Sequence, residues 1–257
     1  YVTEDTTRAR PDTLKALYTL AIDCGAARIC LADTVGHATP DGVRQLVRFI
    51  RRDVIAPTGR DVKLDWHGHR DRGLGLANTL AAIEEGVDRV HGTALGIGER
   101  VGNTEMDLLL INLKLLGMHD ADLSRLAEYC HVVSEATGVP IPASYPCIGE
   151  DAFRTGTGVH AAAIVKAKMK GDDWLVDRVY SGIPAAMFGL RQRIDISHMS
   201  GLSNVKHWLA EHGYDAGNDA LCQEVFALAK RTNRVLTEAE IRACCDAFLN
   251  AQARTSA

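Results

Sequence analysis

The sequence predicts an α/β fold of the (β/α)₈ TIM-barrel type, with half of the barrel present and a helical subdomain after it. Strand and helix patterns alternate with short connections over residues 1–120, as in a parallel sheet. Polar residues follow each of four predicted strands, at the rim where barrels place their sites. We therefore divide the chain into a half-barrel, 1–120, and a helical linker with C-terminal subdomain, 121–257, whose own helices start from about residue 140.

The elements of the first part follow from residue spacing. Apolar residues three, four and seven positions apart mark helices, and short apolar runs mark buried strands. Thr39 and Pro40 start one helix, as the cap and the first helical residue. In chain order we predict a strand end at 1–5, a helix at 13–24, a strand at 27–32, a helix at 39–50, a strand at 62–66, a helix at 75–85, a strand at 89–93 and a helix at 104–116.

The second part has helical spacing only. A proline-containing linker at 138–146 separates its first helix from the others. Thr237 and Glu240 form a capping box ahead of the last helix. The predicted helices are 122–137, 160–170, 205–213, 218–232 and 237–252.

Composition narrows the class of protein. The 257 residues are 46% hydrophobic and 24% charged, as in globular proteins, and the net charge of -4 gives no reason to expect nucleic acid or an anionic membrane as a partner. No apolar run has the length of a bilayer span. The seven cysteines are scattered and none forms C-x-x-C, so we expect reduced thiols and a cytoplasmic protein.

Two histidines follow the predicted strand at 62–66. Because alternate residues of a strand point to the same side, His67 and His69 project together, with Gly68 on the opposite face. Two imidazoles on one strand suit a divalent metal. A single core histidine is more often structural, but a pair at a strand end favours ligation. We expect the other histidines outside these motifs to be non-catalytic, with His91 as the first exception to consider because it lies on a barrel strand.

A glycine-rich segment, residues 96–103, follows the next strand. Its glycines let the backbone approach a ligand, and Asn103 offers a hard oxygen to a metal. The alternative is a tight turn that only caps the following helix, since Asn is a good cap. The two functions are compatible. With His67 and His69, the segment favours a metal-dependent enzyme over a binding module.

Three segments carry extended motifs: DTVGHATP at 33–40, HGHRDRGLGLAN at 67–78 and GIGERVGN at 96–103. They resemble D-T-V-G-x-A-T-P, H-x-H-N-D-x-G-x-A-x-A-N and G-x-G-E-R-x-G-N of the 2-isopropylmalate synthase and homocitrate synthase family. Shorter segments that also resemble this family lie at 4–5, 149–153, 156–160 and 200–204, so the resemblance covers nearly the whole chain.

This resemblance implies that the first part is the C-terminal half of a barrel that condenses acetyl-CoA with a 2-oxo acid, as in leucine and other amino-acid biosynthesis. It implies a divalent metal, Mg²⁺ or Mn²⁺ with Zn²⁺ as an alternative, which would polarise the ketone. His67 and His69 would be ligands, and Asn103 a third, weaker one. The expected partners are the 2-oxo acid, acetyl-CoA and a second copy of the chain.

The resemblance also implies catalytic and substrate-binding residues. Thr34 would hold the carboxylate of the 2-oxo acid. Glu4 and His160 would form the proton-transfer pair, with His160 reaching the neighbouring subunit's site in a homodimer. Glu99 would shape the glycine-rich loop.

The chain departs from the family pattern in two places. Arg70 stands where the family usually has Asn. The family's first strand carries an Arg-Asp pair within R-D-x-x-Q, which supplies a metal ligand and stabilises the enolate, and no such segment occurs here. We therefore expect the chain to be inactive alone and to need an N-terminal half-barrel, in the same gene or as a separate partner chain.

Two other functions compete with the synthase. A carbon-carbon lyase of the hydroxymethylglutaryl-CoA type would have a cysteine in its glycine loop, but no cysteine lies between Cys30 and Cys130. A non-catalytic half-barrel subunit fits the missing Arg-Asp strand. The intact His67, His69 and Asn103 oppose that alternative.

Overall fold

The computed structural model describes residues 1–255, which form two compact units. The first unit consists of residues 1–121 and 128–140, and the second of residues 122–127 and the chain from 141 onward. Within this described length, no helix is both long and apolar enough to cross a membrane.

A three-stranded parallel sheet forms the centre of the first unit, in the order β1–β2–β3. Val2 adds a parallel bridge to Cys30 on the other edge of β1, so the predicted strand end at residues 1–5 pairs with the sheet. The α/β fold with parallel strands is confirmed. The strands are β1 (Arg28–Asp33), β2 (Lys63–Gly68) and β3 (Arg89–His91).

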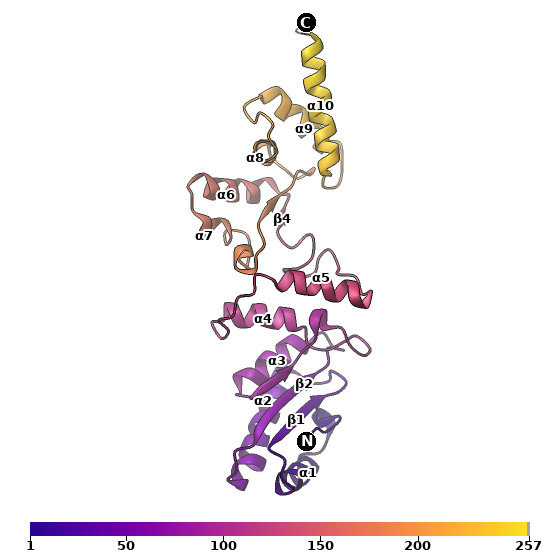
Figure 1. The fold of residues 1–257 in the computed structure, drawn as a ribbon, viewed down its shortest axis with the longest axis vertical. Helices are drawn as coiled ribbons and strands as arrows, with labels where there is room; N and C mark the ends of the chain where they lie inside the picture. The colour runs from indigo at the N-terminus through magenta and orange to yellow at the C-terminus, as the bar shows by residue number, and fades with distance from the viewer. Residues whose placement is uncertain (256–257) are drawn as a thin grey trace. The chain divides into compact units, whose positions relative to one another are not determined.

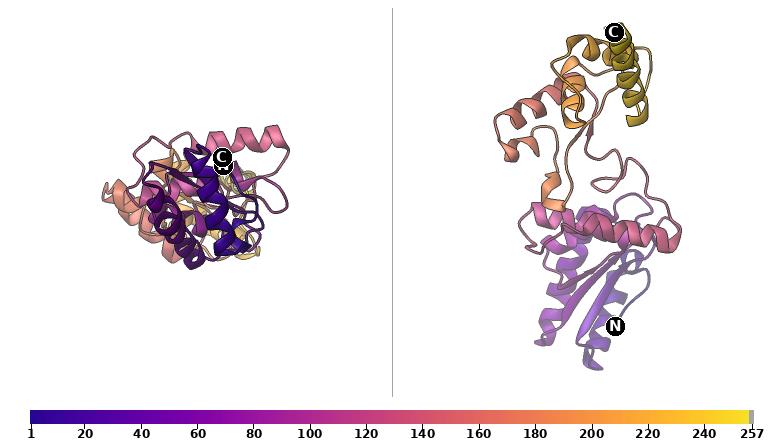
Figure 2. Two further views of the ribbon diagram at one scale, coloured as in Figure 1. Left: turned by 90° about the horizontal axis from the view of Figure 1, so that it is seen from below. Right: turned by 45° about the horizontal axis from the view of Figure 1, so that its top comes forward.

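Helices alternate with these strands, as the spacing predicted. Figure 1 shows β1 and β2 side by side with α2 and α3 running along them, and the right panel of Figure 2 shows the same strands from another side. A π-helical turn, Ile50–Ile55, continues α2. The helices up to the second unit are α1 (Pro11–Asp23), α2 (Pro40–Phe49), α3 (Gly75–Glu84), α4 (Met106–Leu115) and α5 (Leu126–Thr137).

The two faces of the sheet differ in chemistry because successive side chains alternate. One face packs against α1, α2 and α3 in a single apolar cluster that includes Ile29, Leu31, Leu64 and Trp66. The intervening residues of β2, Asp65 and His67, belong to the opposite face. The helices therefore cover one face, and Asp65 and His67 lie on the other.

Two local predictions are confirmed, and most element boundaries differ from the predicted ones by one to four residues. Thr39 caps α2 by accepting a hydrogen bond from Gly42 N at 3.2 Å, with Pro40 as the first helical residue. Gly68 lies on the face opposite His67, as predicted, where a Cβ atom would lie 2.9 Å from the Trp66 indole nitrogen. Helix α4 begins two residues after the predicted start because Thr104 pairs with the sheet ends, its N–H donating to Gly68 O at 3.1 Å.

The second unit contains more than the predicted helices. Two short strands, β4 (Arg154–Thr155) and β5 (Arg193–Ile194), form a parallel pair. Strands of two residues are too short to show alternation, so the sequence did not predict them. The Thr237–Glu240 capping box is confirmed, with Thr237 N donating to the Glu240 carboxylate at 2.8 Å. The helices are α6 (Gly158–Met169), α7 (Asp173–Val176), α8 (Leu202–Glu211), α9 (Asp219–Lys230) and α10 (Glu238–Thr255).

Candidate metal and substrate site

The candidate site lies at the carboxyl ends of the three parallel strands. The segments that follow β1, β2 and β3 meet there, because parallel strands end at the same edge of a sheet. Backbone hydrogen bonds join them: His69 N donates to Asp33 O at 3.1 Å, and Arg70 N donates to Gly102 O at 3.2 Å. Residues far apart in sequence are thus held side by side at this rim.

His67 and His69 lie near each other, as predicted, with ring centroids 5.3 Å apart. His91 faces His67 from the neighbouring strand, and the two Nδ1 atoms are 3.3 Å apart. Burial lowers the pKa of His67, and the adjacent His91 and His69 lower it further. His67 is therefore held neutral near pH 7, which is the form that binds a metal.

His69 contacts Asn103, the predicted third ligand. The two residues form an antiparallel bridge, and His69 Nε2 lies 3.3 Å from Asn103 Nδ2. His69 is 8% exposed, and its Nδ1 is buried with no hydrogen-bond partner. Because Asn103 contacts the other ring nitrogen, an ion held together with the Asn103 amide would bind His69 through Nε2, in place of this hydrogen bond.

The glycine loop fits closely around Asn103. A Cβ at Gly98 would collide with the Asn103 amide oxygen, and one at Gly102 would collide with the Gly96 carbonyl. Gly102 also has φ of 104°, which L side chains rarely adopt. The glycines therefore permit the close backbone approach that places the Asn103 amide against His69.

Arg70, which stands where the family pattern usually has Asn, contacts the glycine loop through its side chain. Its Nε donates to Val101 O at 2.7 Å, and its guanidinium pairs with the Glu105 carboxylate. Arg70 therefore ties the segment after β2 to the glycine loop. Its side chain is engaged with protein groups and does not disrupt the approach of Asn103 to His69.

Arg100 ties the same loop to the segments after β1 and β2. Its guanidinium donates to both Asp71 oxygens, at 2.8 and 3.0 Å, and to Thr34 O at 2.7 Å. This hydrogen bonding lowers the pKa of Asp71. Arg100 itself has φ of 56°, so a non-glycine residue is held in a left-handed conformation here.

Replacing Arg100 with alanine is expected to loosen the glycine loop. Backbone amides of Gly102 and Asn103 should exchange with deuterium faster than in the unmodified protein, whereas amides of β1 should not change. Because the folded pKa of Asp71 is lowered, the ion pair should hold at neutral pH and be lost only as the pH falls through that lowered value. Unchanged exchange in Arg100→Ala would show that other contacts hold the loop.

Three of the predicted site residues, Thr34, Glu4 and Glu99, differ in exposure and in hydrogen bonding. Thr34 Oγ1 accepts a hydrogen bond from Asp5 N at 2.7 Å, which leaves the hydroxyl proton able to donate. Glu4 is exposed at the end of the N-terminal segment. Glu99 is also exposed, and its carbonyl accepts from Gly102 N at 2.9 Å. Glu99 therefore contributes to the turn of the loop through its backbone.

His160 lies in the first turn of α6, in the second unit. The side chain is exposed, and its ring packs on Tyr180 with centroids 4.1 Å apart. The exposed imidazole thus has an aromatic neighbour against one side of its ring.

Two buried carboxylates near the site were not among the predicted site residues. Asp65 is 1% exposed, and its carboxylate is held between the guanidinium groups of Arg28 and Arg89. Asp33 is fully buried and accepts hydrogen bonds from Thr7 Oγ1 and from His37 N, at 2.8 and 2.9 Å. The signal for Asp65 was its position two residues before His67, on the same face of the strand.

The donor set suits a metal with oxygen and nitrogen ligands. Across residues 1–255 there is no group of three His, Cys, Asp or Glu side chains that could hold an ion. The chain therefore offers His67 and His69 with the amide of Asn103, and a complete coordination shell needs further ligands from substrate, water or another segment.

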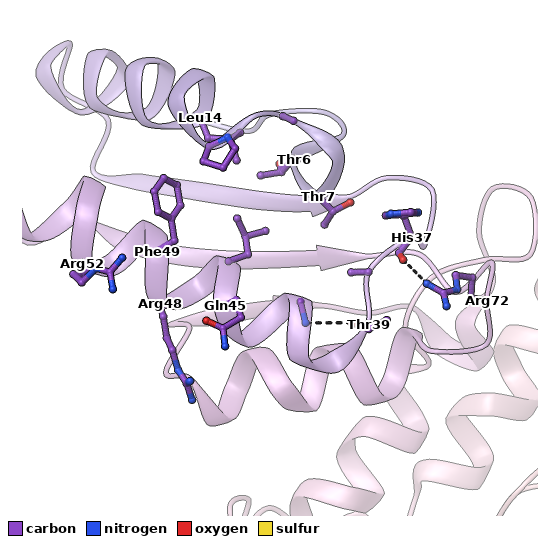
Figure 3. A pocket seen from close by; sticks show the side chains of 15 residues that line it. Thr6, Thr7, Leu14, His37, Thr39, Gln45, Arg48, Phe49, Arg52 and Arg72 are labelled. Atoms are coloured by element: carbon purple, nitrogen blue, oxygen red, sulfur yellow. Dashed lines mark hydrogen bonds between the residues drawn. The ribbon is translucent and has the colours of Figure 1, made fainter.

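A pocket of about 610 Å³ lies on the helix-covered side of the sheet (Figure 3). Leu14 and Phe49 contribute apolar surface, and Arg72 at its edge donates to the His37 carbonyl at 2.7 Å. None of the residues proposed as metal ligands lines this pocket. It is therefore separate from the candidate metal site.

Similarity to known proteins agrees with these motifs. A homocitrate synthase of Methanothermobacter thermautotrophicus is 33% identical over 90% of this chain and 56% of its own length. A protein described as a probable 2-isopropylmalate synthase of Ignicoccus hospitalis is 33% identical over 98% of this chain and 60% of its own length. A 2-isopropylmalate synthase of Pyrococcus abyssi is 36% identical over 64% and 35%.

The chain thus spans between about a third and three fifths of the length of these relatives. The HMGL-like family matches residues 1–133, the segment that contains the parallel sheet, the histidine pair and the glycine loop. Since this segment is more than half of the 257 residues, the chain belongs to the HMGL-like family.

Proposed function

We propose that this protein contributes the metal-binding half of an enzyme that condenses acetyl-CoA with a 2-oxo acid. The observation that carries the proposal is the convergence of His67, His69 and Asn103 at the carboxyl ends of adjacent parallel strands. The names of the similar synthases support the same reaction class. The three-stranded sheet is then the C-terminal half of a (β/α)₈ barrel, with the second unit as its subdomain.

A divalent ion, Mg²⁺ or Mn²⁺ with Zn²⁺ as an alternative, fits the residues present. His67 and His69 would hold it through imidazole nitrogens, with Asn103 as a weaker oxygen ligand. The contact between His69 Nε2 and the Asn103 amide, and the glycine cradle around that amide, support this assignment. When bound, the ion would polarise the ketone of the 2-oxo acid as a Lewis acid.

The chain's own side chains would bind the substrate and move its proton. The Thr34 hydroxyl proton is available to a substrate carboxylate. His160 and Glu4 would take the proton from the methyl group of acetyl-CoA, so that this carbon can bond to the ketone carbon. Hydrolysis of the thioester then releases the CoA thiol. We assign His160 to the site of a second subunit in a homodimer.

The lyase alternative has less support. The glycine loop at 96–103 contains no cysteine, and its Arg100 is built into the rim through Asp71 and Thr34. The relatives described above are named as synthases. A non-catalytic half-barrel subunit remains the competing outcome that the experiment below separates.

The test is release of CoA thiol from acetyl-CoA in the presence of 2-oxo acids and Mg²⁺ or Mn²⁺. The chain would be assayed alone and together with an N-terminal half-barrel segment that carries R-D-x-x-Q. We expect turnover only with both halves and with metal. Cleavage of a hydroxymethylglutaryl-CoA would instead support the lyase. A stable complex of the two halves with neither activity would support a scaffold, and robust turnover by the chain alone would refute the need for a second half.

A further inference from the structure

We propose that His91 is a positioning residue that fixes the tautomer of His67. His91 Nδ1 accepts a hydrogen bond from His67 Nδ1–H, which leaves the lone pair of His67 Nε2 free for a divalent ion. The inference rests on the metal site proposed above and adds the residue that prepares it. His91 and Asp65 lie outside both the histidine motif at 67–78 and the glycine loop at 96–103. His91 would act on His67 directly, and Asp65 would act through His91.

The two rings are held together by the sheet. His67 and His91 are register partners on neighbouring parallel strands, so both side chains project from the same face. Their Nδ1 atoms are 3.3 Å apart, and the ring planes are inclined at 63°. A neutral imidazole has one N–H donor and one acceptor nitrogen, so one Nδ1 must donate and the other must accept.

The direction of this hydrogen bond decides whether His67 can bind a metal. If His91 donated, His67 would carry its proton on Nε2, the nitrogen that faces away from His91. That proton would have to leave before an ion could bind. If His67 donates, Nε2 already presents a lone pair, and no protein group among residues 1–255 hydrogen-bonds to it.

Asp65 selects the second direction. Its Oδ2 lies 3.8 Å from His91 Nε2, too far for a hydrogen bond but close enough for its charge to favour a proton on that nitrogen. Arg28 and Arg89 hold the buried carboxylate in place. With its proton on Nε2, His91 has only a lone pair on Nδ1, so His67 must donate. Asp65 thus acts on His91 through its charge alone, and His91 is the outer hydrogen-bonding partner that orients His67.

NMR can determine the tautomer of His67 directly in the metal-free protein. Ring-nitrogen chemical shifts and ring-proton correlations from ¹⁵N-histidine NMR show which nitrogen of His67 carries the proton. We expect Nδ1–H in the unmodified protein. We expect that preference to weaken in His91→Phe, which keeps ring bulk without an acceptor, and to persist in His91→Gln, whose amide oxygen can accept from Nδ1–H.

Mn²⁺ affinity, measured by calorimetry, is the second test of the proposal. Loss of an outer partner typically weakens metal affinity by about 10–100-fold, so His91→Phe should fall in that range and His91→Gln should recover most of the loss. His131→Ala is the control, because His131 is exposed on α5. Circular dichroism and thermal unfolding confirm that each variant is folded.

The outcomes separate the two proposals. An Nε2–H tautomer of His67 in the unmodified protein overturns the inference, as does a His91→Phe variant with unchanged tautomer and unchanged Mn²⁺ affinity. If the unmodified protein binds no Mn²⁺ while His67 shows the Nδ1–H form dependent on His91, the positioning role stands and the metal site fails. If His91→Phe does not fold, the tautomer of the unmodified protein and the behaviour of His91→Gln decide.

Discussion

Replacing His67 with alanine is expected to remove divalent-metal binding and, in the completed enzyme, all metal-dependent condensation. His67 supplies one of two imidazoles at the site, and burial keeps it in the neutral, ligating form. Since loss of an outer partner already costs about 10–100-fold in affinity, loss of a direct ligand should exceed that range. Mn²⁺ affinity by calorimetry and CoA-thiol release at limiting metal measure the two effects.

The fold should survive this substitution. His67 is half-buried on the polar face of the sheet, opposite the apolar cluster that packs against α1, α2 and α3. Thermal unfolding should therefore shift little relative to the His131→Ala control. Full activity of His67→Ala at limiting metal would disprove its assignment as a ligand.

Replacing His160 with alanine is expected to lower condensation by about 10²–10⁴-fold, the usual effect of losing a general base. Metal affinity should not change, because His160 is assigned to proton transfer and not to metal ligation. His198→Ala is the matched control, since His198 is another exposed histidine of the second unit. Steady-state kinetics on the completed enzyme would give the change in kcat.

Mixed dimers show whether His160 acts in the partner subunit. His160→Ala and His67→Ala subunits, each inactive alone, should regain part of the activity when they are mixed, because one hybrid site then carries both histidines. Confirmed mixed dimers without rescue would place His160 within its own subunit or outside the reaction.

Much of the first unit could be predicted from residue spacing. Local periodicity depends only on the residues of one segment. It predicted the alternation of strands and helices, the Thr39 cap and the common side of His67 and His69. The short strands β4 and β5 were missed because two residues show no period. Residues 122–125 lie outside α5, where the Asp122 side chain accepts from Ser124 N at 2.9 Å, a local bond that competes with helix formation.

By itself the sequence determined the α/β class, the family motifs and the identity of the histidine pair, because these depend on order and spacing along one strand and its loops. Tertiary structure alone decided the partners across strands. Sheet register sets His91 against His67 and brings Arg28 and Arg89 to the carboxylate of Asp65. Loop closure places Asn103 on His69. Such contacts join residues more than twenty positions apart, and only the pairing of strands in space fixes which of them meet.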